Sequence, residues 1–188
     1  NPSNHYFWSR DAFSSRDRGV INVQYTLPVG RGKRYLGQSP RAVDAALGGW
    51  QIGWVSYFQS GQYFTPTFAG SDPSNTNTVG GLPDRIADGN LPAGQRTRVR
   101  WFDASAFVAP PAGRFGNSGV NILEGPGLNL HHLSAIKEFR ITERVQFVLQ
   151  SMITNIFNHP HFDFPNANIS VPASVGRVSQ LREGAGGR

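Results

Sequence analysis

The chain has 188 residues, of which 22 are glycine, 13 are proline, 12% are aromatic and only 16% are charged. This length and composition are typical of a β domain with many turns, and they exclude a disordered acidic tail. The absence of cysteine excludes a disulfide scaffold and thiolate metal sites, and the net charge of +6 comes from scattered basic residues without a nucleic-acid-binding motif, so we expect no nucleic acid partner.

The first predicted strand covers residues 19–28 and shows the period-two alternation of a half-exposed strand. One face carries Ile21, Val23, Tyr25 and Leu27, and the other face carries Asn22, Gln24 and Thr26. Pro28 ends the strand because proline cannot donate a hydrogen bond to the ladder. Glycines and a proline interrupt the next stretch, and we expect Arg41 to Leu47 to form a short helical turn.

The second predicted strand covers residues 50–64, and Gly61 allows a bend or bulge within it. One face of this strand carries Trp50, Ile52, Trp54 and Phe58. Residues 65–127 contain glycine, proline, asparagine, serine and aspartate throughout, and no strand is predicted there. A connection of this length is uncommon in a compact soluble domain, so we expect one long functional loop.

Two further strands, at 128–140 and 144–158, flank the short connection Ile141-Thr142-Glu143, which indicates a tight hairpin. In the last strand, one face carries Val145, Phe147, Leu149 and Ile153. The other face carries Gln146, Gln150 and Thr154, beside Val148 and Met152. Residues beyond 158 are expected to form another loop.

Short turns that alternate with long loops are typical of outer-membrane barrels. Each predicted strand is also long enough to cross a bilayer at a tilt, which takes roughly 9–11 residues. The predicted fold is therefore all-β, with antiparallel strands that form a segment of a transmembrane β-barrel and one long extracellular loop. A polar group that faces lipid unpaired is costly, so the polar faces should look into the lumen. The lumen-facing candidates are Asn22, Gln24, Thr26, Gln146, Gln150 and Thr154, and we expect most of them to pair with each other or with a plug rather than to line a transport route.

Several segments of the chain resemble the C-terminal barrel region of TonB-dependent receptors of the Oar-like group. They are YTLPVGRGKR, LGGWQIGWVSYFQSGQYFT, WFDASAF, FGNSGVNILEGPG, KEFRITERV and NIFNHPHF, and together they span most of residues 11–170. Their order and spacing carry the resemblance more than any one segment does.

The resemblance implies a barrel in the bacterial cell outer membrane that actively takes up a ligand with energy relayed by TonB. It implies outer-membrane lipid, an imported ligand and the TonB complex as partners, the last through a plug region that lies outside this chain, and it implies no cofactor. It also places residues 65–127 on the outer side of the membrane. The family usually ends in one more strand with a terminal aromatic residue, whereas this chain ends in LREGAGGR, so we expect a partial barrel segment.

Two residue clusters are weaker site candidates. Trp101, Phe102 and Asp103 would form an exposed aromatic pair beside a carboxylate that grips a sugar or peptide, or they would anchor the loop to the barrel rim. His159, His161 and Asp163 alternate as metal ligands on an extended chain would. Pro160 within the second cluster makes a plain loop the favoured interpretation, and we expect no metal.

No nucleophile motif and no helix with paired metal ligands is found, so we expect that the protein is not an enzyme. Two alternatives to a transport receptor stay open. One is a soluble all-β binding module, which predicts that Ile21, Val23, Trp54, Phe147 and Leu149 form a closed core. The other is a surface adhesin that uses residues 65–127 for contact.

Overall fold

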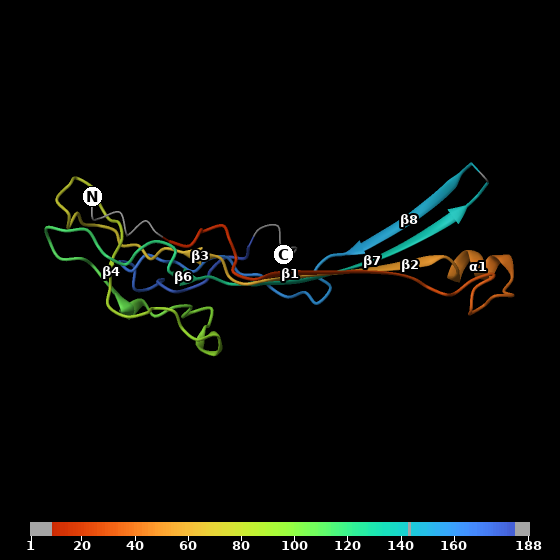
Figure 1. Ribbon diagram of the computed structural model, residues 1–188, viewed down its shortest axis with the longest axis horizontal. Coiled ribbons are helices and arrows are strands. Elements are labelled where there is room, and N and C mark those ends of the chain that lie inside the picture. The colour runs from red at the N-terminus through yellow and green to blue at the C-terminus, as the bar shows by residue number, and fades with distance from the viewer. Residues whose placement is uncertain (1–8, 143, 183–188) are drawn as a thin grey trace. The chain divides into compact units, whose positions relative to one another are not determined.

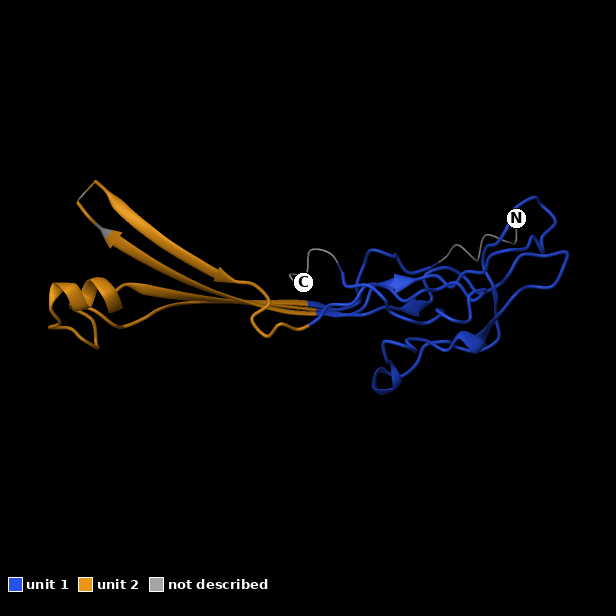
Figure 2. Cartoon of the chain, turned by 180° about the vertical axis from the view of Figure 1, so that it is seen from behind, with its two compact units in different colours: residues 1–18, 59–128, 160–183 blue, residues 19–58, 129–159, 184–188 orange. Residues whose placement is uncertain are grey.

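The computed structural model of the chain describes residues 9–142 and 144–182. These residues form two compact units (Figure 2). The described part of unit 1 comprises residues 9–18, 59–128 and 160–182, and that of unit 2 comprises residues 19–58 and 129–159. No helix in the described part of the chain has the length and apolar character needed to span a membrane.

Unit 2 is built on a four-stranded sheet in the order β1-β2-β7-β8, drawn as long strands in Figure 1. The strands are β1 (Arg18–Thr26), β2 (Trp50–Gln59), β7 (Leu128–Arg140) and β8 (Gln146–Ile153). All four predicted long strands are present, and α1 (Arg41–Leu47) confirms the predicted helical turn. The second strand ends at Gln59 instead of residue 64, and the fourth is shorter at both ends than predicted.

The hairpin between β7 and β8 is slightly longer than the sequence indicates. The register pairs Arg140 with Gln146, so five residues connect the strands. The backbone N–H groups of Ile141 and Thr142 both donate to the carbonyl of Val145, at 3.0 and 3.1 Å. Glu143, which was predicted in this turn, lies outside the described residues.

The strand registers give the sheet one apolar face and one more polar face. Leu27 N–H donates to Trp50 O at 2.9 Å, and this antiparallel pair puts the two side chains on the same face. The β7–β8 register places Phe139 opposite Phe147. Lys137 Nζ lies 5.2 and 5.1 Å from the ring centroids of Trp50 and Phe139, so β2 and β7 present these two rings on the same face. We define the apolar face by the apolar residues that lie on this side of the four strands: Ile21, Val23, Tyr25, Leu27, Trp50, Ile52, Trp54, Phe58, Phe139, Phe147, Leu149 and Ile153.

The apolar face is not covered within unit 2, and this overturns the core predicted for a soluble binding module. Val23 and Phe147 are 51% and 54% exposed. Every residue of the edge strands β1 and β8 is exposed, on both faces. The described long strands of unit 2 thus form one open sheet rather than two packed sheets. In water such a face would need a second layer to cover it, whereas a lipid environment satisfies it directly.

Unit 1 contains the region in which no strand was predicted, and that prediction is wrong in detail. Three short strands lie within residues 65–127: β4 (Asp84–Arg85), β5 (Phe107–Val108) and β6 (Leu123–Glu124). A further short strand, β3 (Tyr63–Phe64), lies at the end of the segment predicted as the second strand. β3 pairs with β6 and β4 pairs with β5, both antiparallel. Two 3-10 turns, Ala93–Gln95 and Ala104–Ala106, complete the unit. Strands of two residues are too short to show a period in the sequence.

The buried core of unit 1 is aromatic. Its members are Phe64, Phe102, Ala106, Phe107 and Leu123. Phe102 contacts Phe64 and Phe107 edge-on, with ring centroids 5.8 and 6.1 Å apart, which is a favoured geometry for aromatic pairs. The tail packs onto this core through Ala167, Ile169 and Val175. The long loop and the tail therefore form one folded body.

Candidate functional site

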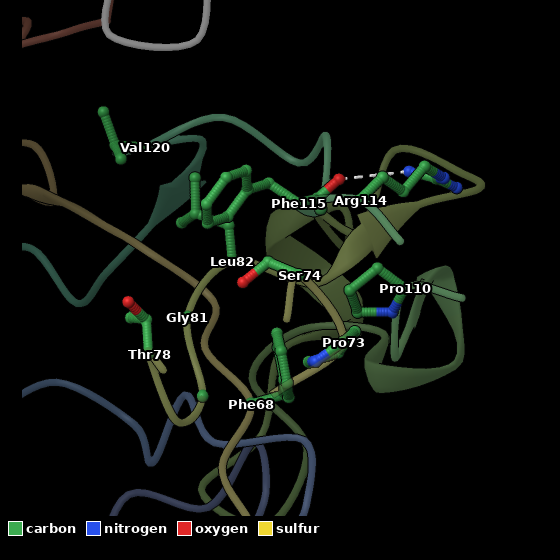
Figure 3. Close-up of a pocket in the computed structure, with 12 residues that line it drawn as sticks. Phe68, Pro73, Ser74, Thr78, Gly81, Leu82, Pro110, Arg114, Phe115 and Val120 are labelled. Atoms are coloured by element: carbon green, nitrogen blue, oxygen red, sulfur yellow. Dashed lines mark hydrogen bonds between the residues drawn. The ribbon is translucent and has the colours of Figure 1, made fainter. Parts of the chain in front are cut away.

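An apolar cavity of about 420 Å³ lies inside unit 1, within the segment predicted as the long outer loop (Figure 3). Its lining side chains are mostly rings, aliphatic groups and glycines. They are Phe68, Pro73, Ser74, Thr78, Gly80, Gly81, Leu82, Pro110, Arg114, Phe115, Gly116 and Val120. This volume falls within the range of small-molecule sites, which are concave and predominantly apolar.

Two close backbone approaches shape the cavity wall. Phe68 and Gly81 exchange backbone hydrogen bonds of 3.0 and 3.1 Å, which close the turn between them. A Cβ atom at Gly80 would lie 2.7 Å from the Phe68 carbonyl oxygen, and one at Gly116 would lie 2.0 Å from the Leu82 carbonyl oxygen. Only glycine fits at these distances, so the glycines that interrupt the sequence pattern are what bring the walls together.

The charge nearest the cavity is neutralised within the protein. Arg114 Nη1 donates to Asp84 Oδ1 at 2.8 Å, and Asn117 N–H donates to the same oxygen at 3.2 Å. The Asp84 side chain is only 8% exposed. In Figure 3 the Arg114 side chain extends away from the ring side chains, while its Nη1 also donates to the Phe115 carbonyl. The cavity therefore presents rings and aliphatic groups rather than a net charge.

The hydroxyl groups at the cavity are engaged within their own loop. Ser74 Oγ donates to Asp72 Oδ1 at 2.7 Å, and this hydrogen bond lowers the pKa of the Asp72 carboxyl. Thr76 Oγ1 donates to Thr78 Oγ1 at 3.3 Å. These hydroxyl groups are therefore hydrogen-bonded within the loop. The cavity has the chemistry of a binding site for an apolar group.

Sequence reasoning missed this cavity. The segments GSDPSNTNTVGGLPD and APPAGRFGNSG supply most of its lining, and the sequence predicts them only as parts of one long loop. A signal was present in the ring residues in and beside these segments, since Phe68, Pro110 and Phe115 stand among polar and glycine-rich stretches. Their convergence depends on contacts between distant parts of the loop, which no local pattern shows.

The three predicted loop candidates, Trp101, Phe102 and Asp103, make contacts that stabilise the fold of unit 1. Phe102 is 2% exposed and belongs to the core, so its prediction as an exposed ligand contact is wrong. Trp101 Nε1 donates to the Glu124 carbonyl at 2.9 Å. Asp103 caps the 3-10 turn that follows it, accepting from Ser105 N–H at 3.3 Å and Ser105 Oγ at 2.8 Å. The Ser105 hydrogen bond is the main cause that lowers the pKa of Asp103.

The lumen-facing candidates lie on or next to the two edge strands. Asn22, Gln24 and Thr26 are on β1, Gln146 and Gln150 are on β8, and Thr154 follows the end of β8. All six are exposed. The register places Gln150 opposite Ile136, on the face away from Phe147 and Leu149. That these residues face a lumen stays a prediction.

The weak metal candidates also have structural partners. His159 exchanges two hydrogen bonds of 3.0 Å with the Asn155 side chain, one through its N–H and one through its carbonyl. Asp163 Oδ1 accepts from Phe164 N–H at 2.8 Å, and His161 is buried. His159 belongs to unit 2, whereas His161 and Asp163 belong to unit 1. Across residues 9–142 and 144–182, no group of three or more His, Asp or Glu side chains is arranged to hold a metal ion.

An open antiparallel sheet with one uncovered apolar face, joined to long loops, is the arrangement expected for a segment of an outer-membrane β-barrel protein. Comparison with known families agrees, because residues 1–188 match the family described as outer membrane beta barrel domain. The chain belongs to this family, and its location is the bacterial outer membrane. No curated protein and no solved structure matches the chain.

Proposed function

We propose that this chain is a barrel segment of a TonB-dependent receptor of the Oar-like group, which takes up a ligand across the outer membrane. The observation that carries the proposal is the apolar cavity in residues 68–120, inside the segment expected on the outer side. A receptor of this kind needs a concave binding site on the outer side of the membrane, where the ligand arrives. The resemblance of KEFRITERV, NIFNHPHF and the other segments supports the same assignment.

The proposal assigns a side of the membrane to each connection. Residues 60–127, between β2 and β7, and the residues after β8 belong on the outer side, because long loops of bacterial barrels lie there. The connections β1–β2 and β7–β8 belong on the periplasmic side. The polar face of the sheet would look into the lumen, and the apolar face into lipid.

The partners follow from the same proposal. Outer-membrane lipid contacts the apolar face, an imported ligand binds the outer side, and the TonB complex acts through a plug region outside this chain. We propose that the chain binds and transports without catalysis and without a cofactor. A surface adhesin is the competing function, because it would also use unit 1 for contact.

TonB binding tests the proposal directly. The full-length receptor is purified in detergent and titrated with the periplasmic domain of TonB from the same bacterium, by surface plasmon resonance. We expect saturable binding that is lost when the plug region is deleted. If TonB does not bind, and if expressing cells adhere equally well when TonB is deleted, the receptor proposal is wrong and the adhesin function is favoured.

A further inference from the structure

We propose that the cavity of unit 1 binds an uncharged compound that contains a ring. This inference rests on the proposed function, and it names the class of ligand that the receptor takes. Three properties of the cavity carry it: the charge balance of its surroundings, the ring side chains of its walls, and its size.

The charge balance favours a neutral ligand. Arg114 lines the cavity, but its guanidinium is engaged by Asp84, whose second oxygen also contacts Arg114. Asp84 is in turn buried and held by Asn117 N–H. An anionic ligand would have to compete with this carboxylate, and a cationic ligand would find no free carboxylate among the lining residues. Burying a charge without a partner is costly.

The walls favour a ring over a flexible chain. Phe68, Pro73, Pro110 and Phe115 supply flat or cyclic surfaces around the hollow, as Figure 3 shows. Aromatic side chains gain most from ligands that stack on them or meet them edge-on. Phe115 is 65% exposed although it lines the cavity, so a bound ring would cover apolar surface that the protein itself leaves open.

The size and stiffness of the site agree with this class. A volume of about 420 Å³ lies at the lower end of the range for small-molecule pockets, roughly 300–1,000 Å³. The backbone approaches at Gly80 and Gly116 leave the wall little room to adapt. A preformed site of this kind suits a compact, rigid ligand, because little ordering entropy is lost on binding.

Protection of an introduced thiol tests the inference. Because the chain has no native cysteine, only the introduced thiol reacts. Thr78 lines the cavity and is exposed, so T78C introduces a thiol at the site with little change in shape. Thr97 is an exposed threonine of the same unit that does not line the cavity, and T97C is the matched control. The rate of maleimide labelling is measured on the full chain in outer-membrane preparations, with and without 2-naphthol.

We expect 2-naphthol to slow labelling of the T78C thiol about fivefold at about four times its Kd, because only the free fraction reacts, and to leave T97C unchanged. F115A in the T78C background should abolish the protection. Equal protection by n-octanol would overturn the ring requirement, and stronger protection by 2-naphthalenesulfonate would overturn the neutral charge. If none of the three compounds changes the labelling rate, the cavity is not a binding site for this class of ligand. The assay needs neither TonB nor energy, so its failure is separable from failure of the receptor proposal.

Discussion

Lys137 Nζ donates a hydrogen bond of 2.6 Å to the carbonyl oxygen of Gly48, the C-cap residue that follows α1. The same ammonium donates to the Ala46 carbonyl at 3.0 Å and lies 5.2 Å from the Trp50 ring centroid. Lys137 is only 2% exposed, on the strand face that carries Phe139. The carbonyls at the end of a helix have partial negative charge, so they compensate a cation that would otherwise be costly to bury. This contact ties β7 to the β1–β2 connection.

Replacing Lys137 by methionine should destabilise the sheet at this end. The K137M side chain keeps the length and the packing, but it leaves the Ala46 and Gly48 carbonyls without this donor, and we expect a loss of about 1–3 kcal/mol. Urea unfolding of the full chain in detergent micelles measures it. The control is K33M at an exposed lysine of the same connection. Equal stability of the two variants would show that the buried ammonium contributes nothing.

The His131 ring connects Trp54 and Phe58 of the apolar face with Ser56 and Phe157. Its Nδ1 lies 2.8 Å from Ser56 Oγ, which accepts from Trp54 Nε1 at 2.7 Å. Its ring centroid is 5.7, 5.5 and 5.0 Å from those of Trp54, Phe58 and Phe157. This cluster fixes the indole of Trp54 in one environment.

We expect H131A to lower stability by about 2 kcal/mol, since each aromatic pair contributes roughly 0.5–1.5 kcal/mol, and to shift Trp54 fluorescence. The matched control is H132A, because His132 meets the Tyr57 ring at 5.7 Å on the opposite face. Thermal unfolding followed by tryptophan emission compares the two variants. An H132A effect as large as that of H131A would contradict a specific role for the cluster.

Gly116 is predicted to tolerate no side chain. A Cβ atom there would lie 2.0 Å from the Leu82 carbonyl oxygen and 2.6 Å from the Pro83 carbonyl oxygen. Backbone must move to accept G116A, and overpacking of this kind costs about 1–3 kcal/mol. Amide hydrogen exchange of residues 107–120 should rise in G116A. It should not rise in G94A, since nothing lies within 4 Å of a Cβ at Gly94.

The Ser105 hydroxyl should make the stability of unit 1 depend on pH in the acid range. Its hydrogen bond lowers the pKa of Asp103 from its ordinary value of 3.8. A lowered pKa in the folded state adds stability above the unfolded pKa, and this contribution is lost as the pH falls through the folded pKa. The loss therefore occurs below about pH 4.

Removing the hydroxyl in S105A should flatten this acid dependence, while S71A at an exposed serine leaves it intact. Tryptophan emission recorded during urea unfolding between pH 2 and pH 6 provides the measurement. A pH profile that is the same in S105A and in the unaltered chain would assign the acid sensitivity to other carboxylates.

The strands of the membrane sheet could be predicted from local sequence. Period-two alternation in β1 and β8 predicted the strands and separated apolar residues such as Phe147 from polar ones such as Gln150. This works because side chains of a strand alternate between faces wherever the strand lies. The turn at Arg41–Leu47 was also predicted locally, from the breakers that surround it.

The fold of unit 1 depends on contacts between distant segments and could not be predicted from local sequence. Phe64, Phe102 and Leu123 meet in one core although they are far apart in the chain, and the short strands that carry or flank them leave no periodic signal. The same distance effect hid the burial of Lys137, since its partners Ala46 and Gly48 lie on another segment. Local pattern fixes which face of a strand a side chain takes, whereas long-range packing fixes what that side chain meets there.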